Sequence, residues 1–399
     1  MKTAVDGKKV VLGVTGSIAC YKAVDLCSKL VQAGALVDVI LTDAAAKFVT
    51  PLTFRSITHR PVVTDIFDAE SELSIEHVAL AERADIVVVA PATAHTIAKL
   101  ALGLADDALT TTILATAAPV VVAPAMDAHM YDNPATQENI ETLKRRGITV
   151  AGPTQGRLAS GLVGWGRMVE PLELLGHIAA ALGRRGDLAN KKVVISAGGT
   201  QEAIDPVRVI TNRSSGKMGY AIAEAARDRG AHAILVTAPT SLPDPPLVEV
   251  HHVESALEMR DAVDAGCKNA DALIMAAAVA DYRSANPAGR KMKKGQGDTL
   301  TVKLTKNPDI LAETQGARVK VGFAAETEDL LSNARQKLVT KNVHLFVAND
   351  VTAQGAGFGA DTNKVTILDR DGGVEDLPIM TKYEVAHRIL DRVARLLQS

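Results

Sequence analysis

The sequence predicts two doubly wound α/β domains, each with a mainly parallel sheet covered by helices on both faces. Three observations lead to this fold class. At 399 residues the chain is too long for one ordinary hydrophobic core. Continuous β-branched runs alternate with segments of helical apolar spacing, which is typical of buried parallel strands joined by crossover helices. The same order of strand, glycine turn, helix and strand also occurs once in each half.

The first half opens on a strand, a turn, a helix and a second strand. Lys9–Val14 is a continuous apolar run that predicts a buried strand, and Gly16–Ser17 predicts a turn. Ile18–Gln32 has helical apolar spacing, Gly34 ends that helix, and Leu36–Leu41 is the next predicted strand.

The second half repeats this order with a longer turn. Val193–Ala197 predicts a strand that meets the pair Gly198–Gly199. A long loop follows, and a helix is expected from near Gly216 to Gly230. Ala233–Thr237 is then the second strand of this half.

Both halves also hold a later buried strand, introduced by Ala-Asp, within 84–94 and within 270–281. The tail, 363–397, predicts a hairpin followed by a closing amphipathic helix. Apolar periodicity lapses between the halves. We therefore expect a first domain at 1–183, a linker at 184–191 and a second domain at 192–399.

Composition limits the possible partners. A formal net charge of −2 argues against a general nucleic-acid or membrane-surface binder. The cysteines are too few for a disulfide framework or a structural zinc site, and Cys20 and Cys27 are expected on the inner face of one helix. No apolar stretch reaches the about 18–20 residues that span a bilayer, so a cytoplasmic location is expected.

Small and polar residues follow several predicted strands of the first half: Gly16–Ser17, Thr42, 91–94 and 124–130. Ligands of open α/β sheets bind outside the carboxyl ends of the strands, which is where these residues lie. Backbone N–H groups at a strand-to-helix turn also suit a phosphate. The sequence therefore predicts a ligand site at this edge, although neither glycine turn is a full dinucleotide fingerprint.

Four motifs in this half resemble the flavin-dependent cysteine decarboxylases. They are VTGSIACYKA, SIEHVALAERAD, VVVAPATAHTIAKLALGLADDALTTT and VVVAPAMDAHMYDNPATQENI. Together with AAAVADYR, KMKK, NPDIL, GFAAET and ARQKLVTKN in the second half, they make the chain similar over nearly its full length to the bifunctional coenzyme A biosynthesis family. That family fuses a phosphopantothenoylcysteine decarboxylase to a phosphopantothenate–cysteine ligase. The resemblance implies two Rossmann-like domains, a flavodoxin-like flavoprotein domain and then a ligase domain.

For the first domain the resemblance implies FMN bound between subunits of a trimer. The flavin pocket would be lined by Gly16, Ser17, Thr42, Thr93 and Met126. The resemblance places the catalytic histidine at His77, whereas an isolated histidine would more often be an ordinary surface or core residue.

Three positions in this domain depart from the family pattern. Asp127 stands where an asparagine is thought to hold the substrate carboxylate, and Ser160 stands where a cysteine donates a proton. His95 also replaces an asparagine. Asp127 remains a candidate substrate-binding residue and Ser160 a candidate catalytic one, and the final reduction is the step these changes would slow.

The stretch around Ser160, GRLASGLVGWGRM, predicts a flexible flap that closes over the flavin and the substrate. We expect its glycines, at 156, 161, 164 and 166, to act as hinges. Trp165 would serve either as apolar cover or as a packing anchor.

The second half carries a mix of residues that suits an anion. Residues 197–219 combine glycines, hydroxyl groups and the cations Arg208, Arg213 and Lys217, and 290–295 is a strongly basic run. Either segment could be only a solvated surface. A basic loop that closes over a triphosphate fits better than a nucleic-acid patch, because stacking aromatics are absent from the run.

The resemblance assigns roles here as well, with CTP as the nucleotide and Mg²⁺ as the metal, whose protein ligands stay unknown. Asn212 and Lys291 would be catalytic, with Arg208 close to the acyl-cytidylate. The other substrate-binding residues would be Met275, Asp281, Pro308, Asp309, Ile310, Leu311, Phe323, Lys337 and Lys341.

The implied partners are small-molecule substrates, with no nucleic acid and no membrane. A homo-oligomer is expected, with a trimeric flavin domain and a dimeric ligase domain. Two alternatives remain open: an active ligase with an impaired flavin half, or a flavin half that serves as a non-catalytic interaction module.

Overall fold

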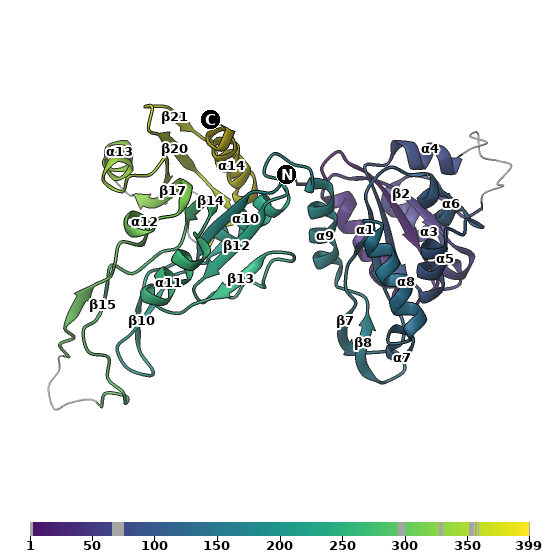
Figure 1. Ribbon diagram of the computed structural model, residues 1–399, viewed down its shortest axis with the longest axis horizontal. Helices are drawn as coiled ribbons and strands as arrows, with labels where there is room; N and C mark the ends of the chain where they lie inside the picture. The colour runs from purple at the N-terminus through teal and green to yellow at the C-terminus, as the bar shows by residue number, and fades with distance from the viewer. Residues whose placement is uncertain are drawn as a thin grey trace. The chain divides into compact units, whose positions relative to one another are not determined.

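The computed structural model of the protein divides into two compact units, residues 1–183 and 184–399 (Figure 1). It describes residues 3–65, 76–293, 300–326, 330–350, 355, 357 and 359–398. Each unit has its own central sheet and its own hydrophobic core.

The first unit is built on a six-stranded sheet in which every neighbouring pair is parallel. In spatial order the strands are β3 (Val62–Val63), β2 (Leu36–Leu41), β1 (Lys9–Val14), β4 (Ile86–Ala92), β5 (Val120–Pro124) and β6 (Thr149–Val150). This is the order of a doubly wound, Rossmann-like sheet, whose direction of winding switches between β1 and β4.

Both faces of this sheet are buried, which explains the continuous apolar runs in the sequence. In β1, Val10 and Leu12 pack on one face and Val11 packs on the other. The first face is covered by α1 (Cys20–Gln32), α3 (Pro51–Thr58) and α9 (Pro171–Gly183). The second is covered by α4 (Glu76–Arg83), α5 (Ala94–Leu102), α6 (Ala108–Ala115) and α8 (Pro134–Arg145).

Helix α1 begins at Cys20 and not at Ile18 as predicted. The Cys20 N–H donates to the Ser17 carbonyl at 3.0 Å, so Ile18 belongs to the turn that follows β1. Cys20 and Cys27 are both buried on the inner face, as expected. Burial raises the pKa of the Cys27 thiol to about 12, which makes it an inert core residue.

The second unit repeats the same winding on an eight-stranded sheet. Its strands are β13 (Glu249–His252), β12 (His232–Thr237), β9 (Lys192–Ala197), β14 (Ala270–Met275), β17 (Ala317–Glu326), β18 (Leu345–Asp350), β20 (Val365–Asp369) and β21 (Val374–Asp376). The first six are parallel and switch between β9 and β14. The last two form the predicted antiparallel hairpin.

Helices cover both faces of this sheet too. One face is covered by α10 (Lys217–Arg227) and the closing helix α14 (Lys382–Gln398). The other is covered by α11 (Ala256–Gly266), α12 (Ile310–Glu313) and α13 (Leu330–Thr340).

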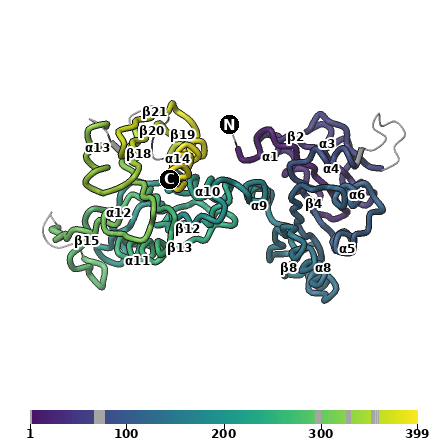
Figure 2. The backbone as a smooth tube through the Cα atoms, turned by 45° about the horizontal axis from the view of Figure 1, so that its top comes forward, coloured from purple at the N-terminus to yellow at the C-terminus, as the bar shows by residue number. Residues whose placement is uncertain are grey.

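Two short antiparallel ribbons stand outside the eight-stranded sheet. One is β10 (Gln201–Ala203) with β11 (Val209–Thr211), and the other is β15 (Tyr282–Ser284) with β16 (Leu304–Lys306). Figure 1 shows both ribbons extending away from the strands of the unit's core, and Figure 2 shows the same of β15. They carry residues 204–208 and the segment around 291, which the sequence singled out.

Candidate functional site

The first candidate site lies at the switch point between β1 and β4. The Thr15 hydroxyl joins the two strand ends, because it donates to the Pro91 carbonyl at 2.7 Å and accepts from the Thr93 N–H at 3.1 Å. Thr15 is buried. The loops after both strands are therefore held together at the carboxyl edge of the sheet, where a doubly wound fold binds its ligands.

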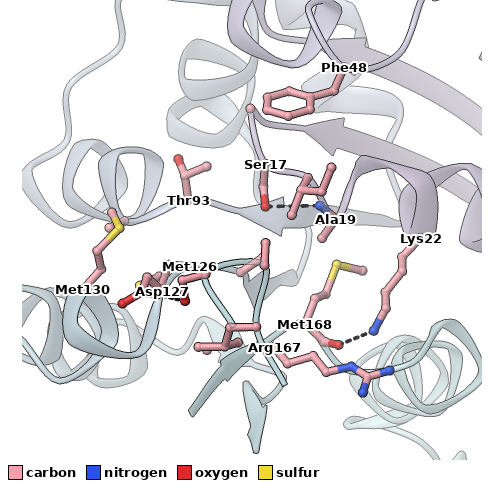
Figure 3. A pocket seen from close by; sticks show the side chains of 18 of the residues that line it. Ser17, Ala19, Lys22, Phe48, Thr93, Met126, Asp127, Met130, Arg167 and Met168 are labelled. Carbon is pink, nitrogen blue, oxygen red and sulfur yellow. Dashed lines mark hydrogen bonds between the residues drawn. The ribbon is translucent and has the colours of Figure 1, made fainter. Parts of the chain in front are cut away.

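Two cavities of about 740 and 640 Å³ adjoin at this edge and share Gly16, Thr93 and Met130. Ser17 and Met126 line the larger cavity (Figure 3), and Thr42 lines the other. The structure thus brings all five predicted flavin-pocket residues to one divided cleft.

The cleft has the chemistry that a flavin mononucleotide needs. Phe48, Met126 and Met130 offer apolar surface in the larger cavity (Figure 3). Thr42 and Thr93 cap the helices that follow their strands, each accepting a backbone N–H at 3.3 Å. Apolar surface with a few fixed polar groups is the common lining of cofactor sites.

The predicted flap is a β-hairpin and not an irregular loop. It consists of β7 (Thr154–Arg157) and β8 (Val163–Arg167), joined by residues 158–162. Its tip, 158–160, lines the larger cavity together with Arg157 and Arg167.

Two of the four predicted hinge glycines pack closely against the turn that holds Met126 and Ala128. A Cβ on Gly166, whose φ is +138°, would lie 2.2 Å from the Met126 carbonyl oxygen, and one on Gly164 would lie 2.9 Å from the Ala128 Cβ. Gly161, with φ of +88° at the tip, is in open space. Trp165 is half exposed and lines neither of these two cavities. Its role as apolar cover stays a prediction.

Two of the three departures from the family motifs, Ser160 and Asp127, are in direct contact. The Ser160 hydroxyl donates to Asp127 Oδ2 at 2.6 Å, and Asp127 Oδ1 accepts from the His129 N–H at 3.0 Å. The Ser160 hydrogen bond, helped by the His129 N–H, lowers the pKa of the Asp127 carboxyl below its ordinary value. Both carboxylate oxygens of Asp127 therefore have a donor.

Lys22 is a residue of this cavity that the sequence did not point to. It is buried, and its ammonium donates to the Met168 carbonyl at 2.7 Å and to Glu170 Oε1 at 2.9 Å (Figure 3). The Lys22 ammonium holds the pKa of Glu170 below its ordinary value. It thereby fixes the segment that leaves β8 against α1.

The smaller cavity is the more polar one. Lys99 lies in its wall with ion pairs to Asp106 at 2.7 Å and Asp107 at 3.0 Å. The hydrogen bond that Lys99 donates to Asp106 is the main cause that raises the pKa of Lys99. His95, the third departure, also lines this cavity.

His77 is the second residue of α4, and its side chain lies outside the described part of the structure. Its predicted role as the catalytic histidine stays a prediction.

The second candidate site occupies the corresponding switch point, between β9 and β14. A cavity of about 500 Å³ is lined by residues 212–219, from the loop and helix start after β9, and by 276–279 and Asp281 after β14. The Thr200 N–H donates to the Ala278 carbonyl at 3.3 Å, and Ala277 N–H donates to the Ser196 hydroxyl at 3.1 Å. These contacts join the two loops, as Thr15 does in the first unit.

Four predicted ligase residues line this cavity: Asn212, Asp281, Phe323 and Lys337. The Asn212 amide donates to the Val279 carbonyl at 3.1 Å, so it is held across the cavity floor by the opposite loop.

Other predicted residues do not line it. Lys341 forms an ion pair with Asp309, and Arg208 lies on the β10–β11 ribbon. Lys291 is exposed and Met275 is buried in the sheet. The remaining three, Pro308, Ile310 and Leu311, precede or begin α12.

Two lysines line the cavity beyond those assigned a role. Lys217 at the start of α10 donates to Asp361 Oδ1 at 2.7 Å and to the Gly359 carbonyl at 2.8 Å. Lys382 donates to the Ala360 and Thr362 carbonyls, and burial lowers its pKa. Lys217 was visible in the sequence as part of a basic loop, whereas Lys382 carried no signal because it opens the last helix, 165 positions after Lys217.

Within the described ranges, His, Cys, Asp and Glu side chains form no group of three or more with metal-binding geometry. A helix long and apolar enough to cross a membrane is also absent from those ranges.

Comparison with known proteins divides the chain similarly. The flavoprotein family model matches residues 1–183, and the model of the DNA/pantothenate metabolism flavoprotein C-terminal domain matches residues 188–397. The chain is 49% identical over 397 residues to the coenzyme A biosynthesis bifunctional protein CoaBC of Bacillus subtilis, with 98% of each chain covered. It is 45% identical over 393 residues to the Escherichia coli (strain K12) protein of the same name, with 97% of each covered. A solved C-terminal domain of a CoaBC protein is 40% identical and covers 53% of this chain and 98% of that chain, with a TM-score of 0.46.

Proposed function

Because the chain belongs to the family of coenzyme A biosynthesis bifunctional proteins, we propose that its two units catalyse successive steps of that pathway. The chain is a ligase and a decarboxylase. In our proposal the second unit joins 4′-phosphopantothenate to cysteine with CTP, and the first converts the 4′-phosphopantothenoylcysteine formed to 4′-phosphopantetheine. The observation that carries the proposal is that the five predicted flavin-pocket residues and four of the predicted ligase residues line cavities at the switch points of their sheets.

The first unit is a flavoprotein domain. We assign FMN to the divided cleft, held by Gly16, Ser17, Thr42, Thr93 and Met126. When bound, FMN supplies the oxidation of the substrate's cysteinyl end that makes loss of CO₂ possible, and it returns the electrons afterwards. The hairpin tip lies over the larger cavity, so its part is to exclude water from the reacting end of the substrate.

Two further side chains of this unit have roles in our proposal. His77 moves a proton as acid or base, since imidazole changes charge near neutral pH. Ser160 passes a proton to the substrate carbon during the last reduction. Because its hydroxyl is bonded to Asp127, this proton transfer is slower than from a free thiol.

In the second unit, CTP activates a carboxylate that does not otherwise react with an amine at neutral pH. Asp281, Phe323, Lys337 and Asn212 line one cavity, and in our proposal the first three hold the nucleotide. Lys291, in the basic segment, neutralises charge that develops on the phosphates. Cysteine then displaces CMP from the acyl-cytidylate, with Asn212 and Arg208 acting on that intermediate.

Three finer assignments complete the proposal. Mg²⁺ accompanies CTP and neutralises its phosphates. The flavin domain assembles as a trimer and the ligase domain as a dimer. The protein works in the cytoplasm, on small-molecule substrates.

The test is one reaction with all substrates. Purified protein is incubated with FMN, 4′-phosphopantothenate, cysteine, CTP and Mg²⁺, and every product is identified by mass. We expect pyrophosphate, CMP, CO₂ and 4′-phosphopantetheine. Omitting CTP must abolish all four products, and failure to form CMP with the complete mixture contradicts the ligase assignment.

A further inference from the structure

Asp205, between β10 and β11, is a buried carboxylate that accepts five hydrogen bonds. Three come from backbone N–H groups: those of Val207 and Arg208, each at 2.9 Å, and that of Met292, at 3.0 Å. Two come from the Arg208 guanidinium, through Nε at 3.0 Å and Nη2 at 2.5 Å. The side chain of Asp205 has no exposed surface.

These contacts join two segments that are far apart in the chain. Arg208 Nη2 also donates to the Met292 carbonyl at 2.9 Å, so Asp205 and Arg208 together hold both polar groups of the Met292 backbone. Met292 follows Lys291 directly. Asp205 therefore ties the predicted transfer residue, Arg208, to the predicted phosphate-binding lysine.

The position of these residues makes such a tie necessary. Both segments lie on ribbons outside the eight-stranded sheet. A long cation on such a ribbon samples many rotamers, and ordering it costs up to about 2 kcal/mol of side-chain entropy. Arg208 is already ordered by its two hydrogen bonds to the Asp205 carboxylate. Substrate binding therefore does not have to order this side chain.

The arrangement leaves one edge of the guanidinium open. Nε and Nη2 are occupied, whereas Nη1 has no hydrogen-bond partner among the residues that the structure describes. The Arg208 side chain is 42% exposed. Its plane is thus fixed from one side while two N–H groups remain for an anionic substrate.

We propose that Asp205 is a positioning residue of the ligase, which holds Arg208 and the Lys291 segment in one arrangement for activation and transfer of the acyl group. This inference rests on the proposed ligase function. It predicts that Asp205 has two separable effects: one on the rate of acyl transfer, through Arg208, and one on the KM for CTP, through Met292.

The test compares Asp205→Asn with Asp205→Glu in two half-reactions: pyrophosphate release at varied CTP, and single-turnover transfer of the acyl group to cysteine. In asparagine an amide NH₂ takes the place of one oxygen: at Oδ2 it opposes the Arg208 guanidinium and the Met292 N–H, and at Oδ1 it opposes the Val207 and Arg208 N–H groups. We expect Asp205→Asn to raise KM for CTP and to slow transfer by up to about 100-fold. Asp205→Glu keeps the charge and should recover part of both.

Asp271→Asn is the matched control. Asp271 is a partly buried carboxylate of the second unit that accepts from the Lys192 N–H at 2.9 Å and is paired with Lys191 at 3.3 Å. It lies at the amino end of β14, whereas the cavity is at the carboxyl end. We expect Asp271→Asn to lose about as much thermal stability as Asp205→Asn but to keep the KM for CTP and the transfer rate unchanged.

Arg208→Gln gives the second arm. If Asp205 acts on transfer through Arg208, adding Asp205→Asn to Arg208→Gln slows transfer no further, while KM for CTP still rises. Full additivity in transfer, or Asp271→Asn effects equal to those of Asp205→Asn, overturns the proposal. A parent protein that forms no CMP at all would instead contradict the proposed function.

Discussion

Ser160 and Asp127 hold each other through one short hydrogen bond, and both depart from the family motifs of the first half. A serine hydroxyl is a far weaker acid than a thiol. This one also has its proton directed at a carboxylate and not at the cavity. The pair therefore changes the proton supply of the site while the residues predicted to hold the flavin stay in place.

Removing the hydroxyl should be visible in the titration of Asp127. Ser160→Ala deletes the donor that chiefly lowers the Asp127 pKa, so that pKa should rise toward its ordinary value. A carboxyl with a lowered folded pKa contributes stability that is present at neutral pH and is lost as the pH falls through that pKa. The small contribution of this exposed pair should therefore shrink in the variant. Carbon-detected NMR titration of the Asp127 carboxyl checks the shift, and an unchanged pKa contradicts the contact.

The same position tests the chemistry. Ser160→Cys should speed formation of 4′-phosphopantetheine, because a thiol with a pKa near 8.5 donates a proton more readily. Ser160→Ala should accumulate the unsaturated, decarboxylated product. If Ser160→Ala forms 4′-phosphopantetheine at the parent rate, the proton comes from another group.

Lys22 should matter for stability more than its place on a helix suggests. Lys22→Met loses two charged hydrogen bonds and leaves the Met168 carbonyl without its donor, which should cost about 2 kcal/mol of unfolding free energy. Lys29→Met is the control in the same helix, since it breaks only a partly exposed i,i+4 pair with Asp25, worth about 0.3–0.5 kcal/mol. Urea denaturation of both variants measures the difference, and equal losses would contradict the role of Lys22.

Single residues also show where sequence reasoning ends. Strand topology predicted a ligand site at the strand ends that include Gly16 and Thr93, and the family resemblance implied that the ligand is a flavin. Lys22 and Asp205 were not predictable. Lys22 contacts Met168, 146 positions away, and Asp205 contacts Met292, 87 positions away, so no local pattern records these two contacts.

Among the elements, the parallel strands were predictable and the β7–β8 hairpin was not. Long β-branched runs reveal strands that are buried on both faces. Glycine has low strand propensity, and β8 alternates it with larger residues. The strand forms there because the glycines let β8 pack against the backbone of 126–128, a tertiary contact that local propensity does not contain.

Helix α10 also packs closely through a glycine, Gly219, which lies against the end of β9. A Cβ on Gly219 would lie 2.6 Å from the Ala197 Cβ and 2.7 Å from the Ser196 carbonyl oxygen, at the end of β9. Gly219→Ala should therefore push α10 off the sheet, lower stability by about 1–3 kcal/mol and impair ligation.

Gly266→Ala is the control, at the end of α11. There a Cβ would meet the Val194 methyl groups at 3.4 Å and the Ile234 Cγ2 at 4.0 Å, so alanine should be tolerated or slightly stabilising. Thermal melts and the ligase assay compare the two variants. An unchanged melt for Gly219→Ala would contradict the packing.

At the scale of the whole molecule, each hydrophobic cluster belongs to one unit. The clusters around Leu12 and Val89 contain only residues of 1–183, and those around Ile195, Met259 and Phe346 contain only residues of 184–399. The two-domain reading of the sequence rested on the same physics, because the chain exceeds the size of one core.

Separate cores predict separate responses to ligand and mutation. Calorimetry should resolve two transitions, and FMN at 100 times its Kd should stabilise only one of them, by about 2.7 kcal/mol. Asn212→Asp should abolish ligation and leave that FMN effect intact, because Asn212 lines the cavity of the other unit. A variant that loses both responses would show that the units are not independent.

The seating of Gly164 and Gly166 on the turn at 126–128 has a mechanical consequence. These contacts restrain β8, so we expect movement of the hairpin to be confined to the five residues of the tip, 158–162. A tip of that length doubles back on itself and reaches about 8 Å, two to three residues at the extended rise. A substrate would then enter the larger cavity after a short movement of the tip, while the two strands of the hairpin stay in place. Lengthening the tip, and not loosening the glycines, is the change that would widen the opening.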